Sequence, residues 1–145
     1  MIYIVILILG LLLDRLSKIY AANNFINNPI EGPIINFTYL ENRGAAFGIL
    51  QDKRIFFIII SVAIVSYLIY HFIKTYKTNP KILNIALSMI VSGAIGNFYD
   101  RLINHYVVDF IEFSFFSFPV FNIADILITV GCALMIIYML FIYEE

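Results

Sequence analysis

Two aspartates in the C-terminal third of the chain, Asp109 and Asp125, are the residues best suited to chemistry. No basic run near them would satisfy two buried carboxylates, no histidine-rich set indicates a metal, and no serine or cysteine nucleophile has a base nearby. Two carboxylates brought close share one proton, because like charges do not both ionise in a medium of low dielectric constant. One then acts as a base that activates water, and the other as an acid that polarises a carbonyl. This pattern predicts aspartic peptidase chemistry, without a metal or another cofactor.

The composition predicts that lipid surrounds these residues. Hydrophobic residues make up 62% of the 145-residue chain and charged residues 13%, against about 45–50% and 25% in soluble domains. A soluble fold of this size lacks the interior to bury so much apolar surface. A net charge of −1 excludes a basic surface for nucleic acid. One cysteine, Cys132, excludes an internal disulfide, and two histidines do not favour a Cys/His metal cluster.

Four segments are long and apolar enough to span a bilayer as helices, which takes about 20 residues. They cover residues 2–22, 55–73, 82–99 and 120–143. The sequence therefore predicts an all-α membrane protein, a single integral membrane domain over residues 1–145. A cleaved signal peptide is the alternative for the first segment. That alternative fits less well, because no basic residue precedes the apolar run and charged residues stand where a cleavage site would be.

The loops indicate how these helices are oriented. Three lysines lie within residues 74–81, so we expect this loop and both termini to be cytoplasmic and the two longer loops to be outside. In the first outer loop, residues 34–40 predict a short strand, and residues 45–48 are small enough for close backbone approach. The second outer loop, residues 109–122, is rich in phenylalanine, which suits a membrane–water interface.

Polar residues of separate segments fall at one depth. At 1.5 Å per residue, Asp14 lies about 20 Å from the inner face, and Asp125 lies about 8 Å below the outer boundary. Asn97 has a similar height, with Asp100 and Arg101 just above it. Ionisable groups inside membrane segments generally face the protein interior or a water-filled cavity. We therefore expect one polar site just beneath the outer surface.

Each of these residues also has a structural interpretation. Asp14 and Lys18 have the spacing of an ion pair on one helical face, which suits the sequence as well as direct chemistry does. Arg101 either extends to lipid headgroups or neutralises carboxylates and holds a substrate. Asn122 is either the N-cap of the last helix or a residue of the site. The sequence leaves these alternatives open.

Five short motifs follow one another along essentially the whole chain. They are residues 14–18 (DRLSK), 42–48 (NRGAAFG), 93–101 (GAIGNFYDR), 108–110 (VDF) and 121–125 (FNIAD). Their order and predicted heights resemble the bacterial lipoprotein signal peptidase family, also called signal peptidase II. The resemblance implies four transmembrane helices with a partly β-structured first outer loop. It implies roles in catalysis for Asp109 and Asp125, in substrate binding for Asn42, Asn97, Arg101 and Asn122, and in structural support for Asp14, Lys18 and Asp100.

The same resemblance implies the reaction. Members of this family are endopeptidases that remove the signal peptides of prolipoproteins by cutting before a cysteine that carries a diacylglyceryl group. The expected partners are these lipid-modified substrates and membrane lipid, and the chain is expected to act as a monomer. The expected location is the bacterial cytoplasmic membrane, with the active site near its outer face.

Three other functions are compatible with carboxylates in a membrane. A small transporter or proton-conducting subunit would place ionisable groups through the full membrane thickness, but the inner halves of the predicted helices are nearly free of them. A structural assembly subunit would explain Ser92 and Gly96, whose spacing favours close helix packing, but not Asp109 and Asp125. A presenilin-type protease shares the chemistry, but its Gly-x-Gly-Asp signature is absent.

Overall fold

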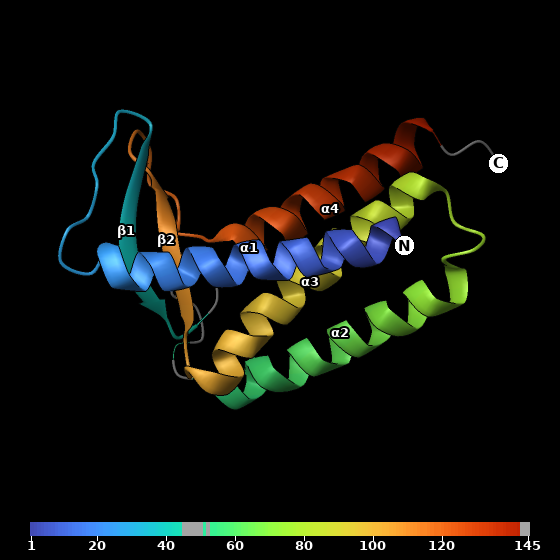
Figure 1. Cartoon of the computed structure of the whole chain (residues 1–145), viewed down its shortest axis with the longest axis horizontal. Coiled ribbons are helices and arrows are strands. Elements are labelled where there is room, and N and C mark those ends of the chain that lie inside the picture. The colour runs from blue at the N-terminus through green and yellow to red at the C-terminus, as the bar shows by residue number, and fades with distance from the viewer. Residues whose placement is uncertain (45–50, 52, 143–145) are drawn as a thin grey trace.

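A computed structural model of the protein describes residues 1–44, 51 and 53–142. In chain order its elements are α1 (Ile2–Asn24), β1 (Ile35–Asn42), α2 (Arg54–Thr75), α3 (Lys81–Ile103), β2 (Val107–Phe113) and α4 (Ile123–Phe141). The helices extend along the long axis of the molecule (Figure 1). The two-stranded sheet lies at one end of them, opposite the N-terminus of α1 and the C-terminal end of α4.

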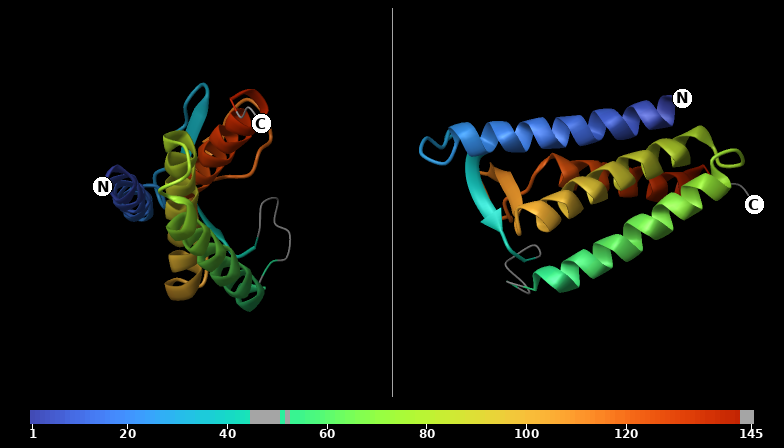
Figure 2. Two further views of the ribbon diagram at one scale, coloured as in Figure 1. Left: turned by 90° about the vertical axis from the view of Figure 1, so that its right-hand side faces the viewer. Right: turned by 60° about the horizontal axis from the view of Figure 1, so that its bottom comes forward.

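The central helix is α3, which contacts α1, α2 and α4 (Figure 2). Eleven of its residues are buried, whereas α2 has no buried residue among those described. Most large apolar side chains of α1, α2 and α4 point outward. Such extensive exposed apolar surface is unsuited to water and suits a lipid environment.

Three of the described helices, α2, α3 and α4, are long and apolar enough to cross a membrane. The 23-residue α1 is also long enough, but it contains Asp14, Arg15 and Lys18. The described chain is thus a mostly helical membrane protein with three candidate spanning helices and a small antiparallel sheet.

The start of α4 differs from the sequence prediction. The sequence predicts an apolar segment from about residue 120, whereas the helix begins at Ile123. Phe121 exchanges two backbone hydrogen bonds of 2.9 Å with Ile111, which keeps the preceding residues extended, and Asn122 caps the helix. The predicted end of this segment, residue 143, lies outside the described residues.

The third helix also ends later than predicted. It continues past Tyr99 to Ile103, so Asp100 and Arg101 belong to its last turns. Arg54 at the start of α2 donates to the backbone carbonyls of Arg101 (2.9 Å) and Leu102 (2.8 Å). Because the final carbonyls of a helix have no partner within it, these bonds stabilise the extra turn.

The strand predicted in the first outer loop is present as β1. It pairs antiparallel with β2, a strand that the sequence analysis did not predict. Leu40 lies opposite Asp109, and a β-bulge separates Leu40 from Phe37, which lies opposite Ile111. Residues 45–48, where close backbone approach is predicted, lie outside the described residues.

A small apolar core joins the sheet to the end of α1. Ala21 and Phe25 pack against Val108 and Phe110 of β2. Because neighbouring side chains of a strand point to opposite faces, Asp109 faces away from Val108 and Phe110. The core therefore directs Asp109 toward the helices.

Two glycines let α3 approach its neighbours closely. A Cβ on Gly93 would collide with the carbonyl oxygen of Ala124 in α4, and one on Gly96 would press on the carboxylate of Asp14 in α1. Ser92 donates a hydrogen bond to a carbonyl of α1 (3.2 Å). Ser92 and Gly96 thus form a helix-packing seam, as their spacing indicates.

Replacing Gly93 by alanine tests this packing. Alanine raises intrinsic helix propensity by about 1 kcal/mol, but its methyl group would push α4 away at Ala124. We expect Gly93→Ala to lower the free energy of unfolding by about 1–3 kcal/mol, measured as a lower melting temperature in detergent. Ala133→Val, which enlarges an exposed position of α4, should have little effect. An unchanged or higher melting temperature for Gly93→Ala would contradict close packing.

Candidate active site

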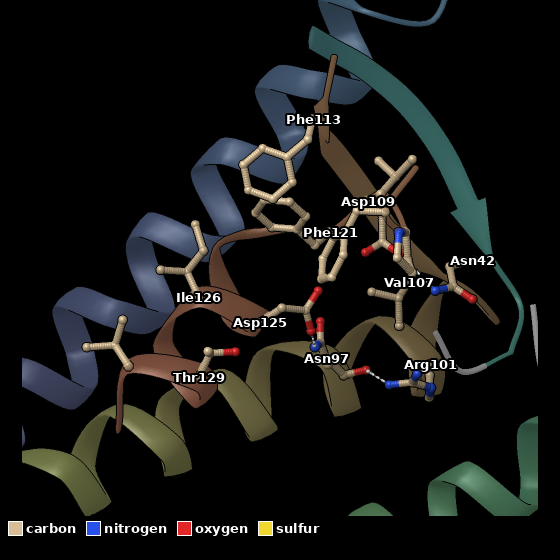
Figure 3. Close-up of a pocket in the computed structure, with 14 residues that line it drawn as sticks. Asn42, Asn97, Arg101, Val107, Asp109, Phe113, Phe121, Asp125, Ile126 and Thr129 are labelled. Carbon is tan, nitrogen blue, oxygen red and sulfur yellow. Dashed lines mark hydrogen bonds between the residues drawn. The ribbon is translucent and has the colours of Figure 1, made fainter. Parts of the chain in front are cut away.

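A cavity of about 470 Å³ lies between the sheet and the first turns of α4 (Figure 3). Asp109 from β2 and Asp125 from α4 point toward it from different elements. Asn42, Asn97 and Arg101 also line it. The structure therefore gathers in one cavity five of the six residues that the sequence analysis assigns to catalysis or substrate binding.

Asp109 is buried and held by two asparagine amides. Asn122 donates to its Oδ1 (2.6 Å) and Asn42 to its Oδ2 (2.8 Å). Burial, reinforced by the negative charge of Asp125, raises the pKa of Asp109 to about 7, while the two amides and the charge of Lys18 oppose this shift. Near neutral pH this carboxyl group therefore holds a proton in a substantial share of the molecules.

Asp125 lies in the first turn of α4, where helix capping fixes its carboxylate. Its backbone N–H donates to Oδ1 of Asn122 (3.0 Å), and its Oδ2 accepts the backbone N–H of Asn122 (3.1 Å). These reciprocal bonds form a capping box. The other carboxylate oxygen, Oδ1, accepts a hydrogen bond from the amide of Asn97 (2.8 Å). Both oxygens of Asp125 thus have a defined donor.

Asn122 is fully buried behind the aspartates and is not part of the cavity lining. Besides capping α4, its amide nitrogen lies near Asp109, the carbonyl of Val108 (3.2 Å) and Oδ1 of Asn97 (3.1 Å). The N-cap interpretation is therefore the one that the structure supports. The substrate contact that the resemblance implies for Asn122 stays a prediction, for a side chain that has no exposed surface in this structure.

A buried ion cluster lies next to the aspartates. The ammonium of Lys18 is 3.0 Å from a carboxylate oxygen of Asp14, 3.0 Å from one of Asp100, and 3.0 Å from Oδ1 of Asn97. The predicted Asp14–Lys18 ion pair is present, and Asp100 completes it. All three charged side chains are nearly inaccessible to solvent.

The two carboxylates of this cluster also hold the backbone. Asp14 accepts the N–H of Ala124 (3.0 Å), and Asp100 accepts the N–H of Val108 (3.3 Å). Each of these amides belongs to the residue directly before one of the cavity aspartates. The ion cluster therefore anchors the start of α4 and the start of β2 at the same time.

Arg101 faces the cavity rather than the lipid. Its guanidinium donates to the carbonyls of Gly44 (3.2 Å) and Asn97 (3.4 Å), and it lies over the ring of Phe57, 5.0 Å from the ring centre. Of the two interpretations that the sequence leaves open, this orientation favours neutralising carboxylates and holding a substrate.

Known proteins share this architecture. The chain matches, over residues 6–141, the family model described as Signal peptidase (SPase) II. It belongs to the signal peptidase II family. The resemblance seen in the motifs is thereby confirmed, and the family's aspartic peptidase chemistry agrees with the chemistry predicted from Asp109 and Asp125.

Individual relatives support membership of the signal peptidase II family. The lipoprotein signal peptidase of Clostridium tetani (strain Massachusetts / E88) is 50% identical over 144 residues, covering 94% of this chain and 91% of the relative. That of Clostridium novyi (strain NT) is 42% identical over 143 residues, covering 94% and 96%. A bacterial membrane enzyme solved at 2.3 Å resolution by the in meso method has a TM-score of 0.86 and 36% identity, covering 99% of this chain and 92% of that one.

In this member of the signal peptidase II family, aromatic side chains of the second outer loop form part of the cavity wall. The cavity is lined by Phe113, Phe118 and Phe121. The sequence instead predicts that the phenylalanines of this loop lie at the membrane–water interface. Thr129 also lines the cavity. Its position four residues after Asp125 places both on one helical face, so the spacing could have indicated it.

The donor groups around the two aspartates do not suit a metal ion. Among the described residues, no three histidine, cysteine or acidic side chains gather as ligands. The oxygens of Asp109 and Asp125 accept N–H groups instead. Such groups point positive hydrogens at the carboxylates, where a cation would otherwise bind.

The pKa of Asp109 predicts a carboxyl group that titrates near neutral pH. We expect the infrared band of a protonated carboxyl to fade with a midpoint near pH 7 and to be missing from Asp109→Asn. Asn42→Ala removes a donor that lowers the pKa of Asp109, so its midpoint should lie at higher pH. Asn36→Ala is the matched control, because Asn36 of the same strand bonds Glu112 (3.3 Å) instead. A wild-type midpoint of about 4, usual for aspartate, would contradict the assignment.

Proposed function

We propose that this protein removes signal peptides from prolipoproteins by cleaving before a diacylglyceryl-modified cysteine, with Asp109 and Asp125 as the catalytic pair. The observation that supports this proposal best is the meeting of these aspartates, from β2 and α4, at one cavity. Among the described lining residues, the other ionisable side chain is Arg101. Membership of the signal peptidase II family supplies the substrate class.

The geometry supports a division of labour between the two carboxyl groups. Asp109, whose pKa is raised to about 7, holds the shared proton and donates it to the carbonyl oxygen of the scissile bond. Asp125 takes a proton from the attacking water, whose oxygen bonds to the carbonyl carbon. The tetrahedral intermediate then collapses: its hydroxyl returns a proton to Asp109, the C–N bond breaks, and the leaving nitrogen receives the proton held by Asp125.

The polar residues in and behind the cavity have two tasks in this proposal. Arg101 and Asn42 reach the cavity from α3 and β1 and hold the substrate backbone. Asn97 and Asn122 position the aspartates, since their amide groups bond carboxylates, and the amide of Asn42 also bonds Asp109. The acyl chains of the substrate remain in the lipid while the scissile bond reaches the cavity.

We propose that α1 is a fourth transmembrane helix. Its Asp14 and Lys18 are buried against α3 and paired with each other, so they need not face lipid. The lysines of residues 74–81 lie at the same end of the molecule as the N-terminus (Figure 1). By the positive-inside rule, both termini are then cytoplasmic and the cavity lies near the outer face of the bacterial cytoplasmic membrane. A single chain supplies both aspartates, which supports a monomeric enzyme.

The catalytic pair is tested by replacing each aspartate with asparagine. Asparagine keeps the volume but does not exchange the required proton, so Asp109→Asn and Asp125→Asn should each lower kcat by about 10²-fold or more. The measurement is cleavage of a diacylglyceryl-modified prolipoprotein by purified protein in lipid, with the melting temperature as a check on folding. Glu112→Gln, a carboxylate of β2 that does not line the cavity, is the control and should retain activity. Substantial turnover by either folded variant would remove that residue from the pair.

Chelation tests the metal-free mechanism. Because the aspartate oxygens accept N–H groups, EDTA should leave the rate of prolipoprotein cleavage unchanged. A zinc-dependent peptidase assayed in the same buffer confirms that the chelator is effective. Loss of cleavage in EDTA that is reversed by zinc would make the aspartates metal ligands.

A further inference from the structure

The buried ammonium of Lys18 determines how a neighbouring amide is oriented. Its three N–H groups face Asp14, Asp100 and the oxygen of Asn97, each at 3.0 Å. An ammonium donates hydrogen bonds and accepts none. The atom of Asn97 that faces Lys18 must therefore be the oxygen, and the amide nitrogen must point away.

The amide nitrogen of Asn97 points to Asp125. It donates to Oδ1 of that carboxylate at 2.8 Å, while Asn122 donates to the oxygen of Asn97 at 3.1 Å. If the amide were flipped, its N–H groups would face two donors and its oxygen would face a carboxylate. Lys18 and Asn122 thus enforce one orientation of Asn97.

We propose that Lys18 is a positioning residue for hydrolysis, which directs the amide of Asn97 onto Asp125 and so holds that carboxylate in place as the base. The proposal rests on the proposed function, because it concerns the same catalytic pair. It assigns Lys18 a part in the reaction beyond an ion pair that stabilises the helices.

A second set of contacts ties Lys18 to both aspartates through the backbone. Its partners Asp14 and Asp100 accept the N–H groups of Ala124 and Val108, the residues before the two catalytic aspartates. One ammonium therefore holds together the two carboxylates that anchor α4 and β2. Losing it disturbs the relative placement of the catalytic groups as well as the orientation of Asn97.

The charge of Lys18 also acts on Asp109. The charged groups that face Asp109 are Asp125 from α4, Arg101 from α3 and Lys18 from α1. Lys18 lowers the pKa of Asp109, so removing the ammonium raises that pKa further. Because Asp109 must be protonated to act as the acid, activity then persists to higher pH. The alkaline limb of the pH profile is therefore expected to move upward.

Two cations of the same cluster provide a matched test. Lys18 and Arg15 both pair with Asp100, Arg15 at 3.3 Å, but only Lys18 bonds Asn97. We expect Lys18→Met to lower kcat by about 10²-fold or more, with little change in KM and with the alkaline limb of kcat/KM at higher pH. Arg15→Met should keep kcat and the pH profile near those of the wild type. The substrate is a diacylglyceryl-modified prolipoprotein in lipid vesicles.

Folding is checked separately, because Lys18→Met leaves two carboxylates without their shared cation. If this variant does not fold, Lys18→Met combined with Asp14→Asn removes one charge of each sign and keeps an oxygen that accepts the N–H of Ala124. The same loss of kcat and the same shift in pH are expected from it. Failure of both variants to fold would assign Lys18 to the fold alone and overturn the proposal.

The outcomes separate this inference from the proposed function. If wild-type protein does not cleave the lipid-modified substrate, the proposed function fails. If it cleaves and folded Lys18→Met retains kcat and the wild-type pH profile, the proposed function stands and the positioning role is overturned. Equal losses in Lys18→Met and Arg15→Met would also overturn it, because the effect would then reflect charge alone.

Discussion

The buried ammonium of Lys18 is the constraint on which the rest of the structure depends. Removing a charge from water costs several kcal/mol unless every donor finds a partner in good geometry. Lys18 meets this demand with Asp14, Asp100 and Asn97, each at 3.0 Å. Since these partners lie on α1 and α3, the two helices must meet closely, and Gly96 leaves room for the carboxylate of Asp14. One desolvated charge thus sets the spacing and rotation of two helices.

The same cluster extends to elements that are distant in the sequence. Asp14 binds the ammonium of Lys18 with Oδ2 and accepts the backbone N–H of Ala124 with Oδ1. Asp100 uses a single oxygen, Oδ2, for both the ammonium of Lys18 and the backbone N–H of Val108. The apolar core of Phe25 and its neighbours fixes the opposite face of β2. Asp109 and Asp125 are consequently held in place together, although one lies on a strand and the other on a helix.

The sequence predicts those parts of this structure that depend on local pattern and residue type. Apolar runs locate all four helices within a few residues, and the costly carboxylates indicate the site. β2 is not predicted, because its strand character comes from pairing with β1, and its phenylalanines suit an interface equally well. Asn122 shows the same limit: its type and position are compatible with a cap or with substrate binding. Its complete burial and its bond to Asp109 are visible only in the folded structure.

The amide of Asn97 lies between Lys18 and Asp125 and bonds both of them. An ammonium in direct contact with Asp125 would form an ion pair with it in a medium of low dielectric constant. With Asn97 between them, Asp125 instead accepts a hydrogen bond of 2.8 Å from a neutral N–H, which Lys18 only orients. Asp125 also lies in the first turn of α4, at the positive end of the helix dipole. Asp109 has no such helix end, and burial raises its pKa to about 7. Two aspartates with the same side chain thereby lie in different electrostatic surroundings, as the proposed division into an acid and a base requires.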